Sequence, residues 1–508
     1  MSELPEIIPR DVHNRKLVAN VHPDDWVNPT PEGRYNLVVI GAGTAGLVSA
    51  AGAAGMGARV ALVERHLMGG DCLNVGCVPS KTLIRAGRAL ADVRAASRFG
   101  IQVPDGARAD FAEVMARVRR VRADISPHDS ARRFSDEYGI DVFLGGGRFV
   151  GPDAVRVGDA TLRFERAVVA TGARAVVPPI PGLAEAGFLT NETVFNLTEL
   201  PARLAVLGGG PIGCELAQSF AQLGSRVTIV EMGQQFLPRE DADAAEVLRA
   251  ALERDGVDVR LATTLERVDT AAGFKRLYLS GDAQQSILEA DAILVGVGRA
   301  PNVEGLGLEA AGVRYGRAGV EVDDFFRTSN RSVFAAGDVC SPFKFTHAAD
   351  FMARAVIQNA FFGFAGKKRA SRLTIPWCTY TDPEIAHVGL YEREAAERGV
   401  EVTTFTVEMA EVDRAIAEGD EDGFVKIHVR KGSDEILGAT VVARHAGDMI
   451  SEVTTAMVGK TGLGKLASVI HPYPTQAEAI RKAGDLYNRT RLTDVRAKLL
   501  RRYFAWRR

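Results

Sequence analysis

Apolar positions in this chain gather in short runs, and the clearest pattern is a run followed by spaced glycines. Residues 35–65, YNLVVIGAGTAGLVSAAGAAGMGARVALVER, give a β-branched apolar run, three glycines, an alanine-rich stretch and a second apolar run that ends at Glu64. Apolar runs of this length bounded by glycine are typical of buried strands, and the alanine-rich stretch favours a helix. The segment therefore predicts a strand, helix, strand unit.

The same segment also allows a second interpretation. Leu37 to Ala58 contains no charged residue and is long enough to cross a bilayer. Its glycines argue against a membrane helix, because they stand at the spacing of a tight turn between a strand and a helix. We therefore favour the soluble unit over the transmembrane helix.

The spacing of the glycines predicts a dinucleotide site. Gly41 suits the tight turn, Gly43 allows a pyrophosphate to approach the helix N-terminus, and Gly46 permits close packing of helix on strand. Glu64, at the end of the second strand, can hold a ribose hydroxyl. The complete order of strand, glycines, helix, strand and acid is much more specific than the glycines alone.

The pattern occurs a second time in residues 203–232, RLAVLGGGPIGCELAQSFAQLGSRVTIVEM, with Gly208, Gly210, Gly213 and a terminal Glu231. Two such units predict either two bound nucleotides or one duplicated ancestor. A carboxylate at Glu231 favours a free ribose 2′-hydroxyl and repels a 2′-phosphate. NADH is therefore expected in preference to NADPH at the second site.

Three further apolar strands end in glycine, at 167–182, 292–302 and 332–340. In the last of them Asp338 follows Gly337 at the strand end. There it either accepts a hydrogen bond from a hydroxyl of a bound cofactor or serves as an ordinary turn residue.

Length and composition set the class of protein. A chain of 508 residues with 46% hydrophobic content can bury a large core in two to four domains. Its formal charge of -2 gives no general attraction to nucleic acid or acidic membranes. The first residues have no signal-peptide features, so a cytoplasmic location, where thiols stay reduced, is expected.

Cys72 and Cys77 stand five residues apart in GGDCLNVGCVPSK, residues 69–81. The other cysteines, at 214, 340 and 378, have no companion at metal-ligand spacing, so we expect no metal site. The two thiols can meet if Cys72 lies in the turn that feeds a helix and Cys77 in its first turn. A helix N-terminus favours the thiolate, which predicts a reactive redox pair beside the first nucleotide.

From about residue 36 to about residue 490 the chain resembles the flavin-dependent pyridine nucleotide-disulfide oxidoreductases, which include dihydrolipoamide dehydrogenase, glutathione reductase and mercuric reductase. The resemblance implies an α/β fold with two Rossmann-like dinucleotide-binding domains, for FAD and NAD, and an α+β C-terminal dimerisation domain. The expected boundaries are 1–35 for an N-terminal extension, 36–200 with 326–371 for the FAD domain, 201–325 for the NAD(P) domain, 372–490 for the dimer interface and 491–508 for a tail.

The same resemblance implies roles for individual residues. Cys77 would be the sulfur on the flavin side, Cys72 the interchange sulfur that meets substrate, and Lys81 with Glu215 a buried pair near the flavin. The implied FAD contacts are Gly41, Gly43, Gly46, Glu64, Lys81, Gly147, Gly172, Asp338 and His347. The implied NAD contacts are Gly208, Gly210, Gly213, Glu231 and Gly298.

One position departs from the family pattern. The family's partner subunit supplies an acid-base histidine before Pro-Thr, whereas HPYPTQAE, residues 471–478, has Tyr473 there, with Glu478 retained and His471 two residues early. A tyrosine with an ordinary pKa near 10 is a poor base. Mercuric reductases also place a tyrosine here, but their C-terminal cysteine pair is missing, since the last cysteine is Cys378. Cys378 itself is either an extra soft ligand or a buried core cysteine.

These observations predict an FAD-dependent oxidoreductase that works as a homodimer and passes electrons from NADH to a small-molecule disulfide or metal-ion acceptor. Alternatives are a metal-ion or quinone reductase in which the cysteines only store electrons, and a membrane-docked electron-transfer flavoprotein. The last rests on the C-terminal tail, where Arg489 to Arg508 holds eight Lys or Arg against one acid. That tail predicts either contact with the inner membrane surface or a solvated or dimer-packed helix whose aromatic side chains dock on the body of the enzyme.

Overall fold

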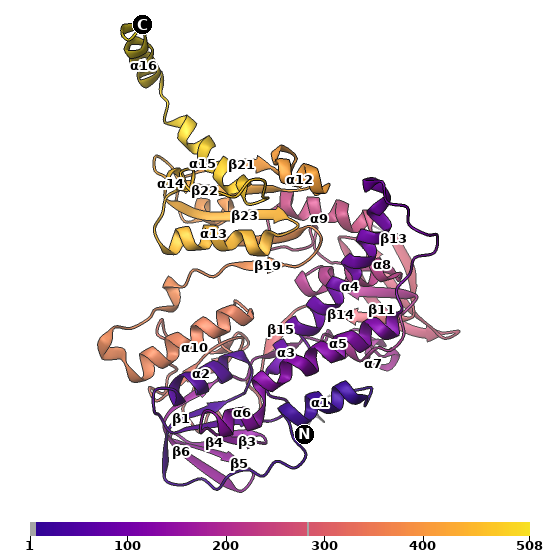
Figure 1. The fold of residues 1–508 in the computed structure, drawn as a ribbon. Helices are drawn as coiled ribbons and strands as arrows, with labels where there is room; N and C mark the ends of the chain where they lie inside the picture. The colour runs from indigo at the N-terminus through magenta and orange to yellow at the C-terminus, as the bar shows by residue number, and fades with distance from the viewer. Residues whose placement is uncertain (1–6, 282–283) are drawn as a thin grey trace. The chain divides into compact units, whose positions relative to one another are not determined.

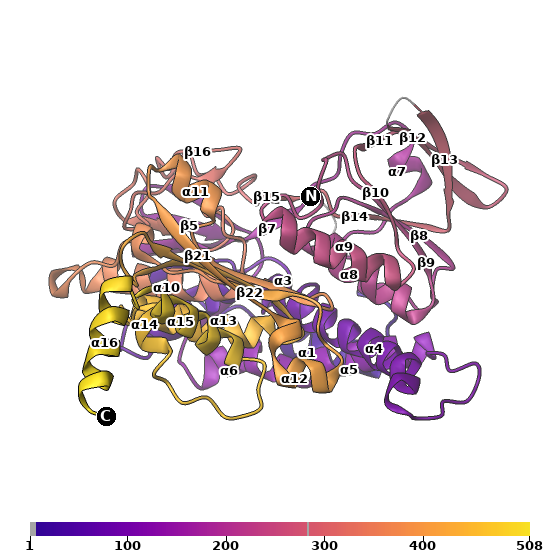
Figure 2. The same ribbon diagram turned by 90° about the horizontal axis from the view of Figure 1, so that it is seen from above.

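The computed structural model describes residues 7–281 and 284–508 as two compact units (Figures 1 and 2). Unit 1 contains the chain up to Phe236 and then Gly256–Leu373. Unit 2 contains Leu237–Asp255 and Thr374–Arg508. The chain therefore leaves unit 1 for one helix and returns before it enters unit 2 for the rest of its length.

The first sheet of unit 1 is built on the first glycine-containing segment. Its strands run β3-β2-β1-β6-β5-β4, with β18 paired to β6. The first four are parallel, with Leu37 opposite Val60 and Val38 opposite Ala167. The bounds are β1 Arg34–Ile40, β2 Val60–Glu64, β3 Asp141–Leu144, β4 Gly147–Gly151, β5 Ala154–Val157, β6 Ala160–Val169 and β18 Val333–Ala335.

This sheet is buried where it is parallel, and every residue of β2 is buried. Parallel strands with both faces covered read as continuous apolar runs, which is why the pattern along 35–65 showed no alternation. Helices α2, Thr44–Ala54, and α10, Thr346–Phe361, pack against each other beside it (Figure 1). The uncharged stretch 37–58 thus forms a strand and an eleven-residue helix. Within the described ranges, no helix combines the length and apolar content needed to cross a membrane.

The residues that precede β1 pack onto unit 1. Helix α1, Val12–Val21, contacts α5, Phe111–Ile125, and buries Leu17 and Val21 completely. Farther along, Asn28 bonds both the amide and the carbonyl of Leu144, at 2.7 and 3.0 Å, on the edge strand β3. The Asn28 side chain thus supplies partners for backbone groups on the edge strand β3.

The second glycine-containing segment builds a four-stranded parallel sheet in the order β10-β9-β8-β14. Helix α8, Pro211–Leu223, follows β8, and an antiparallel meander of three strands follows β10. The bounds are β8 Arg203–Leu207, β9 Arg226–Val230, β10 Asp258–Arg260, β11 Thr263–Ala271, β12 Phe274–Gly281, β13 Gln284–Ala290 and β14 Ala292–Val295.

Shorter elements complete unit 1. An antiparallel ribbon joins β7, Ala173–Ala175, to β15, Arg299–Pro301, and a second one joins β16, Tyr315–Gly316, to β17, Gly319–Val320. The other α-helices in the described part of unit 1 are α3 Gly70–Asn74, α4 Cys77–Ala95, α6 Ala131–Asp136 and α7 Leu183–Ala186. The expected division of this unit into FAD and NAD(P) domains stays a prediction.

Unit 2 is an antiparallel sheet in the order β19-β20-β23-β22-β21, with helices on it. Its strands are β19 Trp377–Thr379, β20 Glu384–Gly389, β21 Val402–Glu408, β22 Phe424–Arg430 and β23 Ile436–Ala443. Its helices are α9 Ala242–Arg254, α11 Glu392–Glu397, α12 Asp413–Glu418, α13 Ala446–Val458, α14 Leu463–Leu466, α15 Glu478–Thr490 and α16 Asp494–Trp506.

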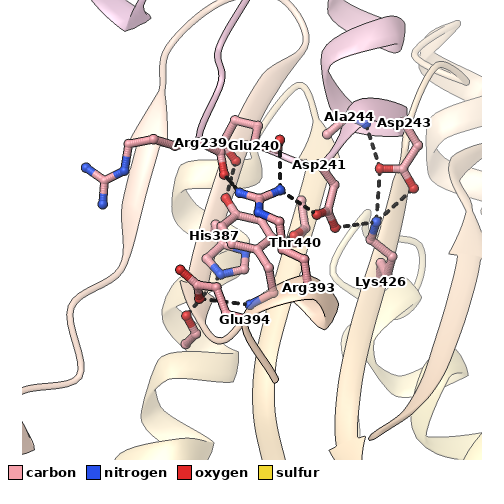
Figure 3. A network of polar contacts seen from close by, with 12 residues as sticks. Arg239, Glu240, Asp241, Asp243, Ala244, His387, Arg393, Glu394, Lys426 and Thr440 are labelled. Carbon is pink, nitrogen blue, oxygen red and sulfur yellow. Dashed lines mark hydrogen bonds and ion pairs between the residues drawn. The ribbon is translucent and has the colours of Figure 1, made fainter. Parts of the chain in front are cut away.

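A charged network fixes the chain before α9 within unit 2 (Figure 3). Arg393 donates to the carbonyls of Arg239 and Glu240 and pairs with Asp241 at 3.1 Å. Lys426, on β22, bridges Asp241 and Asp243 at 2.8 Å each. Helix α9 stands between β9 and β10 in sequence. The network explains why it nevertheless belongs to unit 2.

Candidate active site

The two glycine turns have the same backbone shape. Gly41 and Gly208 have φ of 101° and 98°, a left-handed conformation that disfavours side chains. A Cβ on Gly41 would lie 2.4 Å from the Ala170 carbonyl oxygen, and one on Gly208 would lie 2.8 Å from that of Gly296. Both turns thus require glycine for conformation and for space.

The other glycines of the two motifs are also matched. Gly43 and Gly210 precede the first residues of α2 and α8 in extended conformation, so free amides of each helix N-terminus face outward. A Cβ on Gly46 or Gly213 would fall 1.7 or 2.2 Å from the carbonyl oxygen of the first glycine. The third glycine of each turn therefore admits no side chain, and a phosphate can reach the helix end.

The two acids occupy equivalent positions as well. Glu64 accepts the amides of Ala42 and His66 at 2.7 and 2.8 Å, and burial raises its pKa. Glu231 accepts those of Gly209 and Gly233, both at 2.7 Å. Each carboxylate is fixed by backbone donors and keeps lone pairs for a hydroxyl. The residues therefore fit a dinucleotide in both places.

The cysteines lie at the junction of two helices. Cys72 belongs to the short helix α3, and Cys77 is the first residue of α4. The sequence predicted a turn around Cys72, whereas the structure has one helical turn before the bend at Val75 and Gly76. Gly76 is confined there, because a Cβ would lie 2.8 Å from the Asp71 carbonyl oxygen.

The surroundings of the two thiols distinguish them. The hydrogen bond from Cys72 lowers the pKa of Cys77 to about 6, helped by the hydroxyl of Thr346 at 3.3 Å and the charge of Lys81. The same thiol-thiol hydrogen bond and burial raise the pKa of Cys72. When the pair loses one proton, the thiolate is therefore favoured on Cys77 over Cys72.

Lys81 lies one helical turn after Cys77, on the same face of α4. Its Nζ donates to Oε2 of Glu215, on α8, at 2.7 Å. Glu215 is buried, and the lysine is about one third exposed. The ion pair joins the redox helix to the helix of the second glycine motif.

The structure adds charged residues that the sequence patterns did not indicate. Arg299, on β15, donates to the Asp71 carboxylate in the redox segment and to the Ala173 carbonyl, and its Nε lies 3.8 Å from Asp338. Lys344 donates to the Asp338 carbonyl at 3.0 Å, and burial raises the pKa of the Asp338 carboxyl. In the sequence Arg299 lies within the strand segment 292–302, and no local signal links it to Asp71, 228 positions away.

The remaining expected cofactor contacts are distributed around unit 1. Gly172 and Gly298 precede β7 and β15, and each carbonyl accepts an amide of the other strand at 3.0 Å. Gly147 opens β4, where a Cβ would lie 3.0 Å from Val63. His347 is the second residue of α10 and stacks on Phe345, with ring centroids 5.5 Å apart.

Close packing also links the first glycine turn to the redox segment and to Asp338. A Cβ on Gly70 would lie 2.7 Å from the Cα of Gly43. Gly337, beside Asp338, has Ala45 of α2 and Ala349 of α10 within 3.4 Å of its Cβ position. The glycine turn, the cysteines, Asp338 and the start of α10 therefore surround one region of unit 1.

The expected acid-base residues lie in unit 2 and have other partners within the chain. Tyr473 is exposed, and its hydroxyl donates to Asp413 at 2.8 Å, which raises the tyrosine pKa. Glu478 pairs with Arg481 at 2.7 Å. His471 is largely buried, with Nε2 2.9 Å from Glu452 and Nδ1 3.0 Å from the Val469 carbonyl. Both nitrogens of His471 are engaged, which suits a structural role.

Cys378 is half-buried in β19, with its sulfur 3.9 Å from the Glu384 carboxylate. Across the described part of the chain, no three His, Cys, Asp or Glu side chains gather in a way that could hold a metal ion.

Comparison with known proteins agrees with this geometry. The pyridine nucleotide-disulphide oxidoreductase family matches residues 35–353, and the dimerisation domain of the same family matches residues 375–484. The mercuric reductases of Lysinibacillus sphaericus and Staphylococcus aureus are each 34% identical over 453 residues, which is 89% of this chain and 82% of theirs.

Solved structures give the same picture. The HOCl-induced flavoprotein disulfide reductase RclA from Escherichia coli has a TM-score of 0.79 at 31% identity, over 89% of this chain and all of its own. A Cu(II) complex of that protein also has a TM-score of 0.79, at 30% identity over 90% of this chain and all of its own. The chain thus belongs to the pyridine nucleotide-disulphide oxidoreductase family and is an FAD-dependent, NAD(P)H-linked oxidoreductase.

Proposed function

We propose that the enzyme oxidises NADH and passes two electrons through FAD to a Cys72–Cys77 disulfide, and that the resulting dithiol then reduces a soft metal ion or a disulfide and is itself reoxidised. Bound FAD would supply two-electron exchange between the nucleotide and the cysteines. The observation that carries the proposal is the environment of Cys77, whose pKa is lowered to about 6 at the start of α4. A stable thiolate is what an electron-transferring sulfur requires.

The surrounding residues give the two sulfurs different roles. Lys81, held by Glu215, keeps a positive charge one turn from Cys77. Cys72 is the more basic thiol, so once deprotonated it is the stronger nucleophile toward an acceptor. The assignment of Cys77 to the flavin side and Cys72 to the acceptor side follows the family pattern.

NADH is the proposed reductant. The Glu231 carboxylate is fixed by two backbone amides at the end of β9, and a 2′-phosphate placed beside it would be repelled. Stopped-flow reduction of the holoenzyme should be faster with NADH than with NADPH at equal concentration. Faster reduction by NADPH would reject this choice.

A soft metal ion is the favoured acceptor. Reduction of a small disulfide releases thiolates that need a proton, and Tyr473, with its pKa raised by Asp413, supplies one poorly near pH 7. Reduction of a metal ion has no such leaving group. The mercuric reductase relatives and the Cu(II) complex of the structural neighbour support this choice.

An acceptor panel tests the function. NADH oxidation would be followed with Hg²⁺ or Cu²⁺ presented as amino-acid complexes, with oxidised glutathione, with lipoamide and with a soluble quinone. We expect turnover with a metal complex that is lost in Cys72→Ser. Turnover of the quinone alone, unchanged in Cys72→Ser, would favour an enzyme that does not use the cysteines on its acceptor.

We also propose a homodimer in which Tyr473 reaches the cysteines of the partner subunit. The match to the family's dimerisation domain supports dimer formation. The exposure of Ile470 and Tyr473, at 94% and 70%, is in keeping with a surface that a second subunit covers.

The tail favours an additional contact with an anionic membrane. Helix α16 lies beyond α15 (Figure 1), and none of its residues is buried. Six large apolar side chains on it are between 46% and 82% exposed: Val495, Leu499, Leu500, Tyr503, Phe504 and Trp506. Such a helix, with basic residues interleaved, suits a bilayer interface.

Co-sedimentation with vesicles tests this contact. The full chain should bind vesicles containing phosphatidylserine and lose most of that binding when residues 491–508 are removed. Vesicles of phosphatidylcholine alone are the control for charge. Equal binding of both proteins, or a dimer that forms only with the tail present and binds no vesicle, would reject the membrane contact.

A further inference from the structure

The segment before β1 is bonded to the redox loop, which we define as residues 66–77. The amide of Met68 donates to the carbonyl of Val21, the last residue of α1, at 3.1 Å. The Nδ1 atom of His22 bonds the carbonyl of His66. The end of α1 therefore fixes the start of the redox loop.

A buried arginine extends this connection to the region between the cysteines. Arg122, on α5, is 1% exposed, and its Nη1 donates to the Asn74 carbonyl at 2.6 Å. Its Nη2 donates to Oδ1 of Asn14, on α1, at 2.9 Å. Burial lowers the pKa of Arg122 to about 10, so the guanidinium is still charged at neutral pH.

Each end of this chain of contacts is itself fixed. Asn14 is 2% exposed, and its side-chain amide donates to the Pro9 carbonyl at 2.7 Å. Asn74, between the cysteines, donates to the carbonyls of Met68 and Gly70 at 3.0 and 2.9 Å. Asn14, Arg122 and Asn74 thus connect α1 to the end of α3, the helix that carries Cys72.

The redox loop needs such support because its own sequence allows many backbone conformations. Gly69, Gly70 and Gly76 lie within it, and glycine loses more conformational freedom on ordering than any other residue. A disulfide forms only within narrow limits of separation and direction of the two Cβ atoms. External contacts that fix the backbone on both sides of Cys72 raise the effective concentration of one thiol toward the other.

We infer that Asn14 and Arg122 are positioning residues for the redox pair, holding Cys72 within bonding reach of Cys77. This inference rests on the proposed function, because it assumes that the two cysteines form a disulfide during turnover. It assigns the segment before the first nucleotide-binding strand a part in setting how readily that disulfide forms.

The test is thiol-disulfide equilibrium in the FAD-loaded enzyme. Samples are equilibrated with mixtures of reduced and oxidised glutathione, in which one protein disulfide and two reduced glutathiones give the dithiol and one oxidised glutathione. Alkylation and peptide mass measurement then give the fraction of Cys72 and Cys77 in each form. The variants are Asn14→Ala, Arg122→Met and Arg122→Lys.

Lys16→Met is the matched control. Lys16 is on the same helix and pairs with Asp124 on α5 at 2.8 Å, and both side chains are about half exposed, so this variant alters a surface contact between the same two helices. We expect Asn14→Ala and Arg122→Met to make the disulfide about tenfold easier to reduce, with Arg122→Lys in between and Lys16→Met unchanged. Flavin reduction by NADH should stay within twofold in all four.

The outcomes separate this inference from the proposed function. If the cysteines of the unaltered enzyme never form a disulfide at any glutathione ratio, the proposed function fails. If they do form it, but Asn14→Ala and Arg122→Met give the same equilibrium as Lys16→Met, the positioning role is wrong. A lower melting temperature with an unchanged equilibrium would likewise mean that the contacts serve packing only. Asn14→Ala keeps the test available if Arg122→Met does not fold.

Discussion

At the scale of single residues, the chemistry of the site depends on which sulfur carries the charge. Thr346 opens α10 and lies 269 residues from Cys77 in sequence, yet its hydroxyl is 3.3 Å from that sulfur. It contributes to lowering the cysteine pKa, together with Cys72 and Lys81. A lowered thiol pKa favours the thiolate form of Cys77 over the thiol.

Thr346→Val removes this donor and should raise the pKa of Cys77 by about one unit, since a hydrogen bond to a charged group contributes about 1.5 kcal/mol. The measurement is a pH titration of the long-wavelength absorbance that a thiolate gives beside bound FAD, in two-electron-reduced enzyme. Thr346→Ser is the control and should titrate like the unaltered enzyme. Identical midpoints for the valine and serine variants would show that the hydroxyl plays no part.

Residue patterns predicted the glycine turns and the position of Cys77 because each depends on neighbours a few positions away. A turn that excludes a Cβ and a thiol at a helix start are both local properties. The contacts of Arg299 with Asp71, of Thr346 with Cys77 and of Arg122 with Asn74 join residues 48 to 269 positions apart. No periodicity in the sequence encodes such pairs, so only the folded chain reveals them.

At the scale of elements, unit 2 is stabilised by buried polar groups around β20. Glu240 accepts Trp377 Nε1 at 2.8 Å and the Tyr391 hydroxyl at 2.5 Å, and His387 stacks on Tyr391. The family resemblance predicted an α+β domain over residues 372–490, but the sequence gave no sign that the chain before α9 joins this sheet. That arrangement depends on charge pairs between segments about 150 to 185 residues apart.

Burial lowers the pKa of His387 to about 3, so the folded protein keeps it neutral. A depressed histidine pKa contributes stability that is present above the unfolded value near 6.5 and is lost as the pH falls toward 3. His387→Gln should therefore be less stable than the unaltered protein at pH 7, and the difference should shrink by about 2 kcal/mol by pH 5. Urea unfolding of both proteins at the two pH values measures this, and a constant difference would contradict it.

Removal of the buried carboxylate should also weaken unit 2. Glu240→Ala leaves the hydroxyl of Tyr391 and the indole of Trp377 without their acceptor, at a cost of about 2 to 4 kcal/mol. The melting temperature of the holoenzyme should fall clearly. Glu246→Ala, which alters an exposed carboxylate of α9, is the control and should leave it nearly unchanged.

At the scale of the whole molecule, the proposed homodimer builds each active site from two chains. Cys72 and Cys77 lie in unit 1, and Tyr473 lies in unit 2, where within its own chain it bonds Asp413. If each partner supplies the tyrosine, Tyr473→Ala and the double variant Cys72→Ser with Cys77→Ser should each be nearly inactive. The prediction assumes that the tyrosine phenol helps to hold the metal acceptor at the cysteines. Refolding the two variants together at equal amounts should then restore about a quarter of full activity, because half of the dimers carry one complete site. A mixture that remains as inactive as its components, despite dimers in light scattering, would reject shared sites.

In the proposed function, electrons from NADH reach Cys72 and Cys77. Alkylation of the anaerobic holoenzyme measures this step. The oxidised enzyme is treated with one equivalent of NADH, alkylated with iodoacetamide and digested, and the peptide that contains residues 69–81 is weighed. We expect two alkyl groups on this peptide only after addition of NADH. In Cys77→Ser the number of alkyl groups should not depend on NADH. Bleaching of the flavin by NADH with no change in the alkylation of this peptide would show that the electrons do not reach the cysteines.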